Sequence, residues 1–146
     1  MVSLKERKVQ APPAFWDDLV NDLQAPEFLR EYVVESVRIA TVDNIVNDLD
    51  DAREAAGLTK AALARAINAD PATLRRLFSG NASNPTLGTL AEVAAALGLK
   101  VALVPLPDNE REKVTLPLLA GRAADATDLA KHLESLRTLR SSSPVA

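Results

Sequence analysis

The sequence of 146 residues contains no cysteine and a single histidine, and both scarcities restrict its chemistry. Without cysteine the chain can form neither a disulfide nor a thiolate metal site. The one histidine, His132, cannot supply the histidine pair that catalytic zinc usually needs, and we interpret it as an ordinary surface or seam residue of a C-terminal helix. We therefore predict no metal site and no cofactor.

Long apolar runs are also absent. The longest apolar region, Leu87 to Leu106, is interrupted by Glu92 and Lys100, so it predicts no membrane-spanning segment. The basic residues within Met1 to Gln10 are not followed by an apolar run of signal-peptide length. We expect a cytoplasmic protein with no membrane partner.

Catalytic groups are equally sparse. The only carboxylate cluster with catalytic potential is Asp48, Asp50, Asp51 and Glu54. On a helix, Asp50 and Glu54 stack four residues apart while the other two lie round the side, and no histidine or cysteine joins them. The sequence has no glycine-rich phosphate loop and no nucleophile elbow. We predict that the protein is not an enzyme.

The formal net charge of −3 hides an uneven distribution. Residues 14–57 carry eleven acidic and three basic side chains, whereas residues 58–106 carry five basic and two acidic ones. A local basic face suits contact with phosphates more than the total charge suggests. The acidic block is consistent with a second, basic partner, and equally with an ordinary solvated helix surface.

Hydrophobic periodicity predicts a mainly helical chain. Asp43, Thr59 and Asp70 are expected N-caps, and Asn68 falls where a tight turn would adopt the left-handed conformation. The helices expected on this basis cover residues 14–24, 26–40, 43–57, 60–67, 71–78, 86–97 and 123–139.

Two stretches predict β-structure. Leu99 to Leu106 is rich in β-branched residues and bounded by Gly98 and Pro107, which is typical of a strand. Lys113 to Leu118 could form a weaker second strand and complete a hairpin. The predicted organisation is an N-terminal arm and acidic helical region over 1–41, a central helical domain with a trailing strand over 42–106, and a C-terminal extension with one helix over 107–146.

The two short helices at Lys60 to Ile67 and Pro71 to Phe78 carry the functional signal. They are joined by a turn of three or four residues, and their apolar positions pack them into a helix-turn-helix whose second helix projects outward. Its outer face carries the predicted base-contacting residues: Ala72, Thr73 and Arg76. An arginine in a major groove can donate two hydrogen bonds to guanine. The predicted contacts to the DNA backbone are Thr59, Lys60, Arg75, Ser79, Asn81 and Ser83. The alternative is that these arginines are a solvated face of a helical interaction module that does not touch DNA.

Residues 58–99, LTKAALARAINADPATLRRLFSGNASNPTLGTLAEVAAALGL, resemble the Xre/Cro family of helix-turn-helix proteins and its HigA-type antitoxin branch. The residues that carry the resemblance are Leu58-Thr59-Lys60, Leu63-Ala64, Leu74 to Leu77, Asn84-Pro85-Thr86-Leu87, Thr89-Leu90 and Ala96-Leu97-Gly98-Leu99. The resemblance extends over residues 42–106 and implies a five-helix, lambda-repressor-like domain. Here that domain would be preceded by N-terminal helices and followed by the strand or hairpin and a C-terminal helix. Asn68 departs from the glycine common in the family's turn.

The resemblance also implies partners. In this branch the strand after the last helix often forms the dimer, which here assigns that role to Leu99, Val101, Leu103 and Val104. The implied function is an antitoxin that binds its operator as a homodimer, neutralises a basic RelE/HigB-like RNase toxin and represses its own operon at the nucleoid. The alternative is a stand-alone Xre-type transcriptional repressor without a toxin partner.

Overall fold

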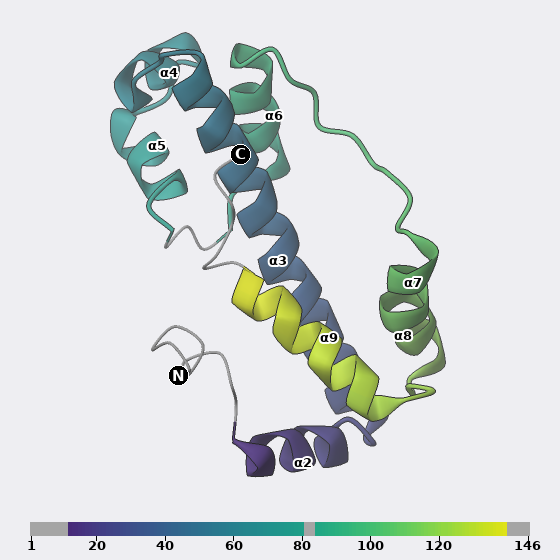
Figure 1. The fold of residues 1–146 in the computed structure, drawn as a ribbon. Helices are drawn as coiled ribbons and strands as arrows, with labels where there is room; N and C mark the ends of the chain where they lie inside the picture. Colours follow the sequence, from purple (N-terminus) through teal and green to yellow (C-terminus); the bar gives the residue numbers. More distant parts are fainter. Residues whose placement is uncertain (1–11, 81–83, 140–146) are drawn as a thin grey trace. The chain divides into compact units, whose positions relative to one another are not determined.

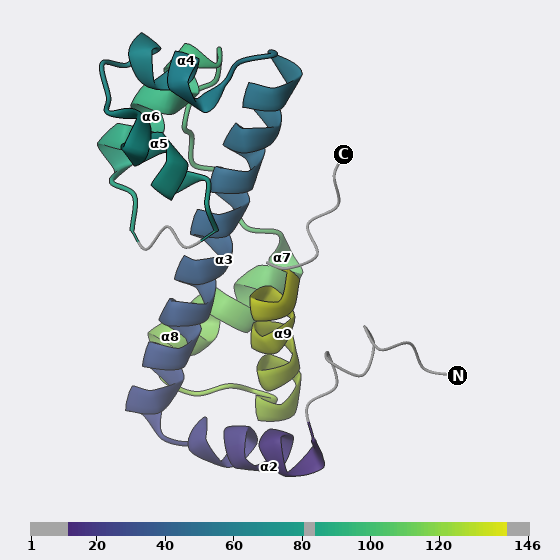
Figure 2. The same ribbon diagram turned by 90° about the vertical axis from the view of Figure 1, so that its left-hand side faces the viewer.

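The computed structural model of the chain describes residues 12–80 and 84–139. Over these residues the fold is helical and contains no strand. The chain divides into two compact units, which Figures 1 and 2 show from two directions. Of the described residues, 12–40 and 105–139 form the first unit, here termed the terminal unit. Residues Thr41 to Val104 form the second, the central unit.

The terminal unit combines helices from both ends of the sequence. It contains α2 (Pro13–Asp22), the first part of α3 (Pro26–Ala55) and α9 (Ala126–Leu139). Between Asp108 and Ala120 the chain is continuously helical as α7 (Asp108–Glu110), the π-helical turn η1 (Arg111–Thr115) and α8 (Leu116–Ala120).

The central unit consists of the second part of α3 followed by three short helices. These are α4 (Lys60–Ala66), α5 (Pro71–Leu77) and α6 (Leu87–Ala96). Among the described residues the unit therefore has four helical segments, not the five that the resemblance implied.

The predicted break between the helices at 26–40 and 43–57 is wrong, because both belong to the single helix α3. Asp43 lies inside it and is half-buried, so it does not begin a helix. Neither glycine nor proline occurs near this position, and nothing in the backbone interrupts the hydrogen-bond ladder. The preference of aspartate for caps is realised only where the chain actually enters a helix.

The predicted strand and hairpin are also wrong. Residues 99–106 form neither strand nor helix, and Lys113 to Leu118 lies in η1 and α8. The first segment has no second strand to pair with in the described chain, and an isolated extended segment does not constitute a sheet. Pro107 opens the helical stretch at 108, and Asp108 and Glu110 occupy its first turn, where acidic residues are favoured.

The short helices begin at the residues that the sequence marks. Thr59 accepts a hydrogen bond from the amide of Ala62 at 3.0 Å, and Asp70 accepts one from the amide of Ala72 at 2.9 Å. Asn68 has a φ of 54°, which confirms the left-handed turn residue. Helix α9 begins at Ala126, three residues later than expected.

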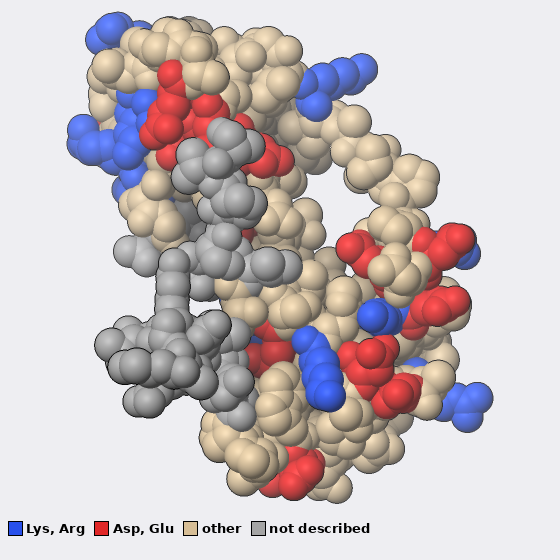
Figure 3. All heavy atoms as spheres, viewed as in Figure 1, with Lys and Arg blue, Asp and Glu red and all other residues tan. Residues whose placement is uncertain are grey.

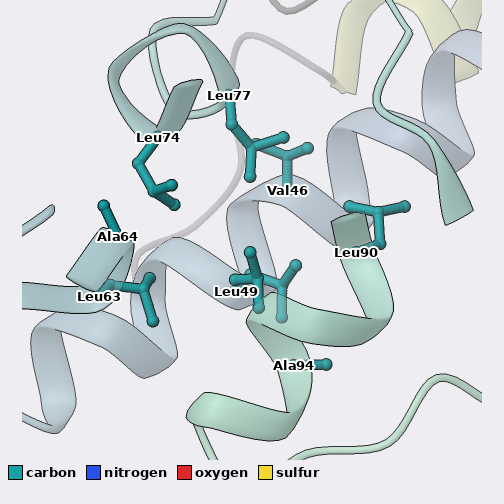
Figure 4. Close-up of a cluster of buried hydrophobic side chains, with 9 residues drawn as sticks. Val46, Leu49, Leu63, Ala64, Leu74, Leu77, Leu90 and Ala94 are labelled. Carbon is teal, nitrogen blue, oxygen red and sulfur yellow. The ribbon is translucent and has the colours of Figure 1, made fainter. Parts of the chain in front are cut away.

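The central unit has one apolar core, formed by side chains from all four of its helical segments (Figure 4). Leu63 and Ala64 of α4 and Leu74 of α5 are completely buried in it. The other buried members are Val46, Leu49, Leu77, Leu90, Val93 and Ala94. Because the fully buried Ala64 has only a methyl group as its side chain, α4 and α5 can approach closely.

The terminal unit has its own core, which α2, α3, η1 and α9 share. Beside this core a polar seam joins α3 to α9. The hydroxyl of Tyr32 donates to Glu134, while Arg137 donates to Ser36 at 2.9 Å and lies 4.3 Å from the centre of the Tyr32 ring. Burial, with the hydrogen bond to Glu134, raises the pKa of Tyr32 to about 12.

A single arginine closes the C-terminal end of α8. Arg30 of α3 donates to the carbonyls of Leu118 at 3.0 Å and Leu119 at 3.3 Å. Gly121 follows the helix with a φ of 74°, and a Cβ there would lie 3.0 Å from the Arg30 guanidinium. The glycine is therefore required both by its backbone conformation and by the space that Arg30 occupies.

Candidate DNA-binding surface

Helices α4 and α5 form a closed helix-turn-helix. The turn between them is held by the amide of Ala69, which donates to the carbonyl of Ala64 at 2.8 Å, and by that of Asn68, which donates to Arg65 at 3.3 Å. Asp70 then caps α5, and Pro71 occupies its first position. The direction in which α5 leaves the turn is thus defined by local hydrogen bonds.

The two faces of α5 differ sharply. Leu74 and Leu77 point into the core, and both are nearly or fully buried. Arg75 and Arg76 are exposed, whereas Ala72 and Thr73 are half-buried. At 100° per residue, Ala72 and Arg76 lie on nearly the same line of the helix surface, opposite Leu74. Of the three predicted base-contacting residues, Ala72 and Arg76 thus lie on the outward side of α5, and the half-buried Thr73 lies at its edge, near the line of Leu77.

Of the residues predicted to contact the DNA backbone, the structure describes Thr59, Lys60, Arg75 and Ser79. Thr59 is exposed and Lys60 half-buried at the start of α4. Ser79, after the end of α5, donates from its hydroxyl to the carbonyl of Arg76 at 2.9 Å. Asn81 and Ser83 lie outside the described residues.

Arg53 of α3 supports the surface from behind, and the sequence reading did not single it out. Its side chain is only 12% exposed, and its guanidinium donates to the Leu58 carbonyl at 2.7 Å and to Asp50 at 2.8 Å. The same group lies 5.8 Å from the ring of Phe78, which ends α5. Arg53 therefore connects the end of α3, the approach to α4 and the end of α5. The available signal was a basic residue in the last turn of a helix, before the stop at Gly57.

Charge is separated on the central unit. Arg65, Arg75 and Arg76 are exposed on α4 and α5, whereas Asp51 and Glu54 are exposed on α3. In Figure 3 the Lys and Arg side chains gather beside α5, with a patch of Asp and Glu next to them. Exposed arginines therefore concentrate on the helix-turn-helix, while Lys100 is a further exposed basic residue of the central unit. The neighbouring acidic patch would oppose a polyanion that extends across it.

Comparison with known proteins agrees with this geometry. Residues 49–104 match the family model described as helix-turn-helix, which is of the Xre/lambda-repressor type. Domains of this family bind DNA and are typically not enzymes, so the match suggests a DNA-binding transcriptional regulator. Neither the comparison with curated proteins nor that with solved structures found a match.

The described part of the chain contains neither a candidate membrane-spanning helix nor a candidate metal-binding cluster. Within residues 12–80 and 84–139, no helix is both long and apolar enough to cross a membrane. In the same part of the chain, no three histidine, cysteine or acidic side chains are arranged so that they could hold a metal ion.

Proposed function

We propose that the protein is a sequence-specific DNA-binding repressor that reads a major groove with α5. The observation that carries this proposal is the exposed pair Arg75 and Arg76 on the outward face of a capped helix whose inward face is buried. A major groove admits one α-helix, and Arg76 can donate two hydrogen bonds to a guanine there. Thr73 is suited to a thymine methyl or a phosphate.

The test compares one proposed base contact with one proposed phosphate contact. Duplexes are first selected with the full chain from a random-sequence pool, and affinities are then measured for a selected and an unselected duplex at two salt concentrations. Arg76→Ala should weaken binding to the selected duplex by about 1–3 kcal/mol and change binding to the unselected one little. Lys60→Ala should weaken both alike and reduce the salt dependence by about one phosphate contact.

The matched control is Arg111→Ala, which removes an exposed arginine from the terminal unit. It should leave both affinities unchanged. If Arg76→Ala lowers binding to the selected and unselected duplexes equally, α5 does not read bases through Arg76 and the proposed reading face is wrong.

We further propose that the protein binds as a homodimer through residues 99–104. Leu103 is 101% exposed and Val104 81% exposed, and residues 100–106 form no backbone hydrogen bond within the described chain. Pairing with the same segment of a second copy would satisfy these groups and cover the side chains. Two-fold dimers of this kind place their recognition helices about 34 Å apart. In sedimentation, Leu103→Asp should convert the dimer to a monomer, and it should lower the affinity for a duplex with two half-sites. A wild-type chain that is monomeric at tens of micromolar and still binds this duplex with undiminished affinity would contradict the proposed dimer.

The second candidate function is that of an antitoxin, which would bind its own operator and neutralise a basic mRNA-cleaving toxin of the RelE/HigB type. The observation that favours it is the set of exposed acids on α2 and α3: Asp17, Asp18 and Asp22 of α2, and Glu27, Glu31 and Glu35 of α3. Opposite fields accelerate encounter with a basic partner. A stand-alone repressor needs no such surface.

A toxin gene next to the gene of this protein would favour the antitoxin function over that of a stand-alone repressor. If one exists, replacing the acids of α3 (Glu27, Glu31 and Glu35) with glutamine should abolish protection in co-expression while sparing DNA binding. The control is the same replacement at Glu92, an exposed acid of α6. Full protection by the triple variant would exclude this face as the contact with the toxin.

A further inference from the structure

The helical stretch from 108 to 120 exposes a stripe of side chains that its own unit does not cover. Leu116 is 51% exposed and Leu119 is 76% exposed, and Glu112 precedes them at the spacing of one helix face. On the opposite side, Val114 and Pro117 are buried in the terminal unit. The stripe therefore lies on the solvent-exposed face of this helical stretch, and the opposite face packs against the rest of the terminal unit.

Three features hold this stripe in place. Arg30 donates to the carbonyls of Leu118 and Leu119, and Gly121 turns the chain sharply after α8. Lys113 adds an ion pair to Asp128 of α9 at 3.8 Å. The exposed leucines are thus carried by a fixed backbone, which lowers the entropy lost when they dock.

An open pocket of about 530 Å³ lies beside the stripe. Its apolar lining residues are Leu116, Pro117, Ala120, Ala123 and Ala124, and its charged ones are Glu112 and Arg122. Both charged residues are exposed, and neither forms an ion pair in the part of the chain that is described. The pocket therefore presents one unpaired charge of each sign around an apolar floor.

We propose that this surface binds the same surface of a second copy of the chain. Leu119 is the most exposed leucine of the stripe and does not line the pocket of its own copy. In a dimer, the Leu119 side chain of each copy can therefore enter the pocket of the other copy. When two such helices pack antiparallel about a two-fold axis, Glu112 of each copy lies toward Arg122 of the other. A surface that carries both the projecting side chain and its receptor, and both signs of charge, is complementary to itself.

The charges argue against other occupants. Of the two charged residues that line the pocket, Arg122 would oppose a strongly basic partner and Glu112 a strongly acidic one. This contact is separate from the proposed pairing of residues 99–104 and does not depend on DNA binding. The contact involves few residues, so its dissociation constant should be above about 1 µM. With such an affinity, dimers formed through residues 99–104 would join into larger assemblies only at high local concentration.

The test is sedimentation equilibrium of the full chain across about 10 µM to 1 mM, without DNA. Leu119→Asp should raise the dissociation constant obtained from the concentration-dependent rise in mass at least tenfold. Leu87→Asp, which changes a leucine of α6 that is 68% exposed, is the matched control and should leave the rise unchanged. All these positions are exposed, so circular dichroism should show the wild-type fold in each variant.

Charge exchange tests the orientation. Glu112→Arg and Arg122→Glu should each weaken association, because each places like charges at both ends of the contact. An equimolar mixture of the two variants, and the double variant, should both recover the wild-type association. A wild-type mass that does not rise up to 1 mM, a Leu119→Asp chain that associates like wild type, or a mixture no stronger than its components would each overturn the proposal. The variants at positions 87, 112, 119 and 122 leave residues 99–104 unchanged. Loss of the dimer in Leu103→Asp therefore tests only the proposed pairing of residues 99–104, and not the contact made by α8.

Discussion

Replacing Arg53 with methionine should destabilise the central unit by about 2–3 kcal/mol. Methionine keeps the apolar stem but removes the guanidinium, so the Leu58 carbonyl loses its donor and the Phe78 ring loses its cation. A hydrogen bond from a charged donor contributes about 1.5–3 kcal/mol and a cation–π contact about 0.5–1 kcal/mol. The ion pair with Asp50 adds about 1 kcal/mol or less, because that carboxylate is 30% exposed and screened by water. These contributions are not independent, so the net figure is smaller than their sum.

The measurement is urea unfolding followed by circular dichroism, combined with amide hydrogen exchange. Exchange should accelerate in peptides from α4 and α5, whereas peptides from α2, in the terminal unit, should keep the wild-type rate. Arg65→Met is the control, since Arg65 is exposed on α4 and its loss should change stability by about 0.5 kcal/mol or less. If Arg53→Met loses no more stability than Arg65→Met, Arg53 does not hold the helix-turn-helix together and the role assigned to it is wrong.

Three further predictions concern single residues. Gly121→Ala should lower the melting temperature more than Gly57→Ala does, because both strain a left-handed backbone but only Gly121 has a guanidinium within 3.0 Å of the new Cβ; equal losses would mean that the guanidinium moves aside freely. Asp70→Ala should cost about 0.5–2 kcal/mol of unfolding free energy by removing the cap of α5, whereas Asp70→Asn should retain most of it; a harmless alanine would show that the cap is not used in solution. Burial, with a smaller contribution from nearby Lys113, lowers the pKa of His132, so the folded protein binds this proton less readily than the unfolded one and stability should fall as the pH drops below 6.5. Proton NMR of the single histidine gives its pKa directly, and His132→Gln should flatten the pH dependence of melting between pH 7 and 5; a folded pKa above 6.5 contradicts this.

The helix-turn-helix could be predicted because its signals are local. Thr59 and Asp70 cap the two helices within three residues of themselves, and Asn68 adopts the left-handed turn that its side chain tolerates. Apolar spacing then determined which side of α5 is buried, as Leu74 and Leu77 show. None of these features depends on a distant part of the chain.

The features that sequence reasoning missed depend on distant partners or on the absence of one. Residues 99–106 have strand-like composition, but a strand requires a neighbour, and Lys113 to Leu118 became helical. Asp43 has the chemistry of a cap, yet it lies within an uninterrupted helix. The role of Arg53 depends on Phe78, which lies 25 residues further along the sequence, and no periodic pattern reveals such a pair.

The exposed segment at residues 99–106 also bears on how long the protein lasts in a cell. Proteases cut most readily where an exposed backbone has no hydrogen-bonded partner. Residues 100–106 offer such a backbone, with Leu103 fully exposed and Val104 81% exposed. If the proposed dimer forms, pairing would hide the segment, and the fraction protected would rise with concentration by mass action. The lifetime of the protein would then increase with its concentration. As the concentration falls, a larger fraction would be monomeric, and each molecule would be degraded faster. Limited proteolysis should therefore cut first between residues 99 and 107, and more slowly as the protein concentration increases.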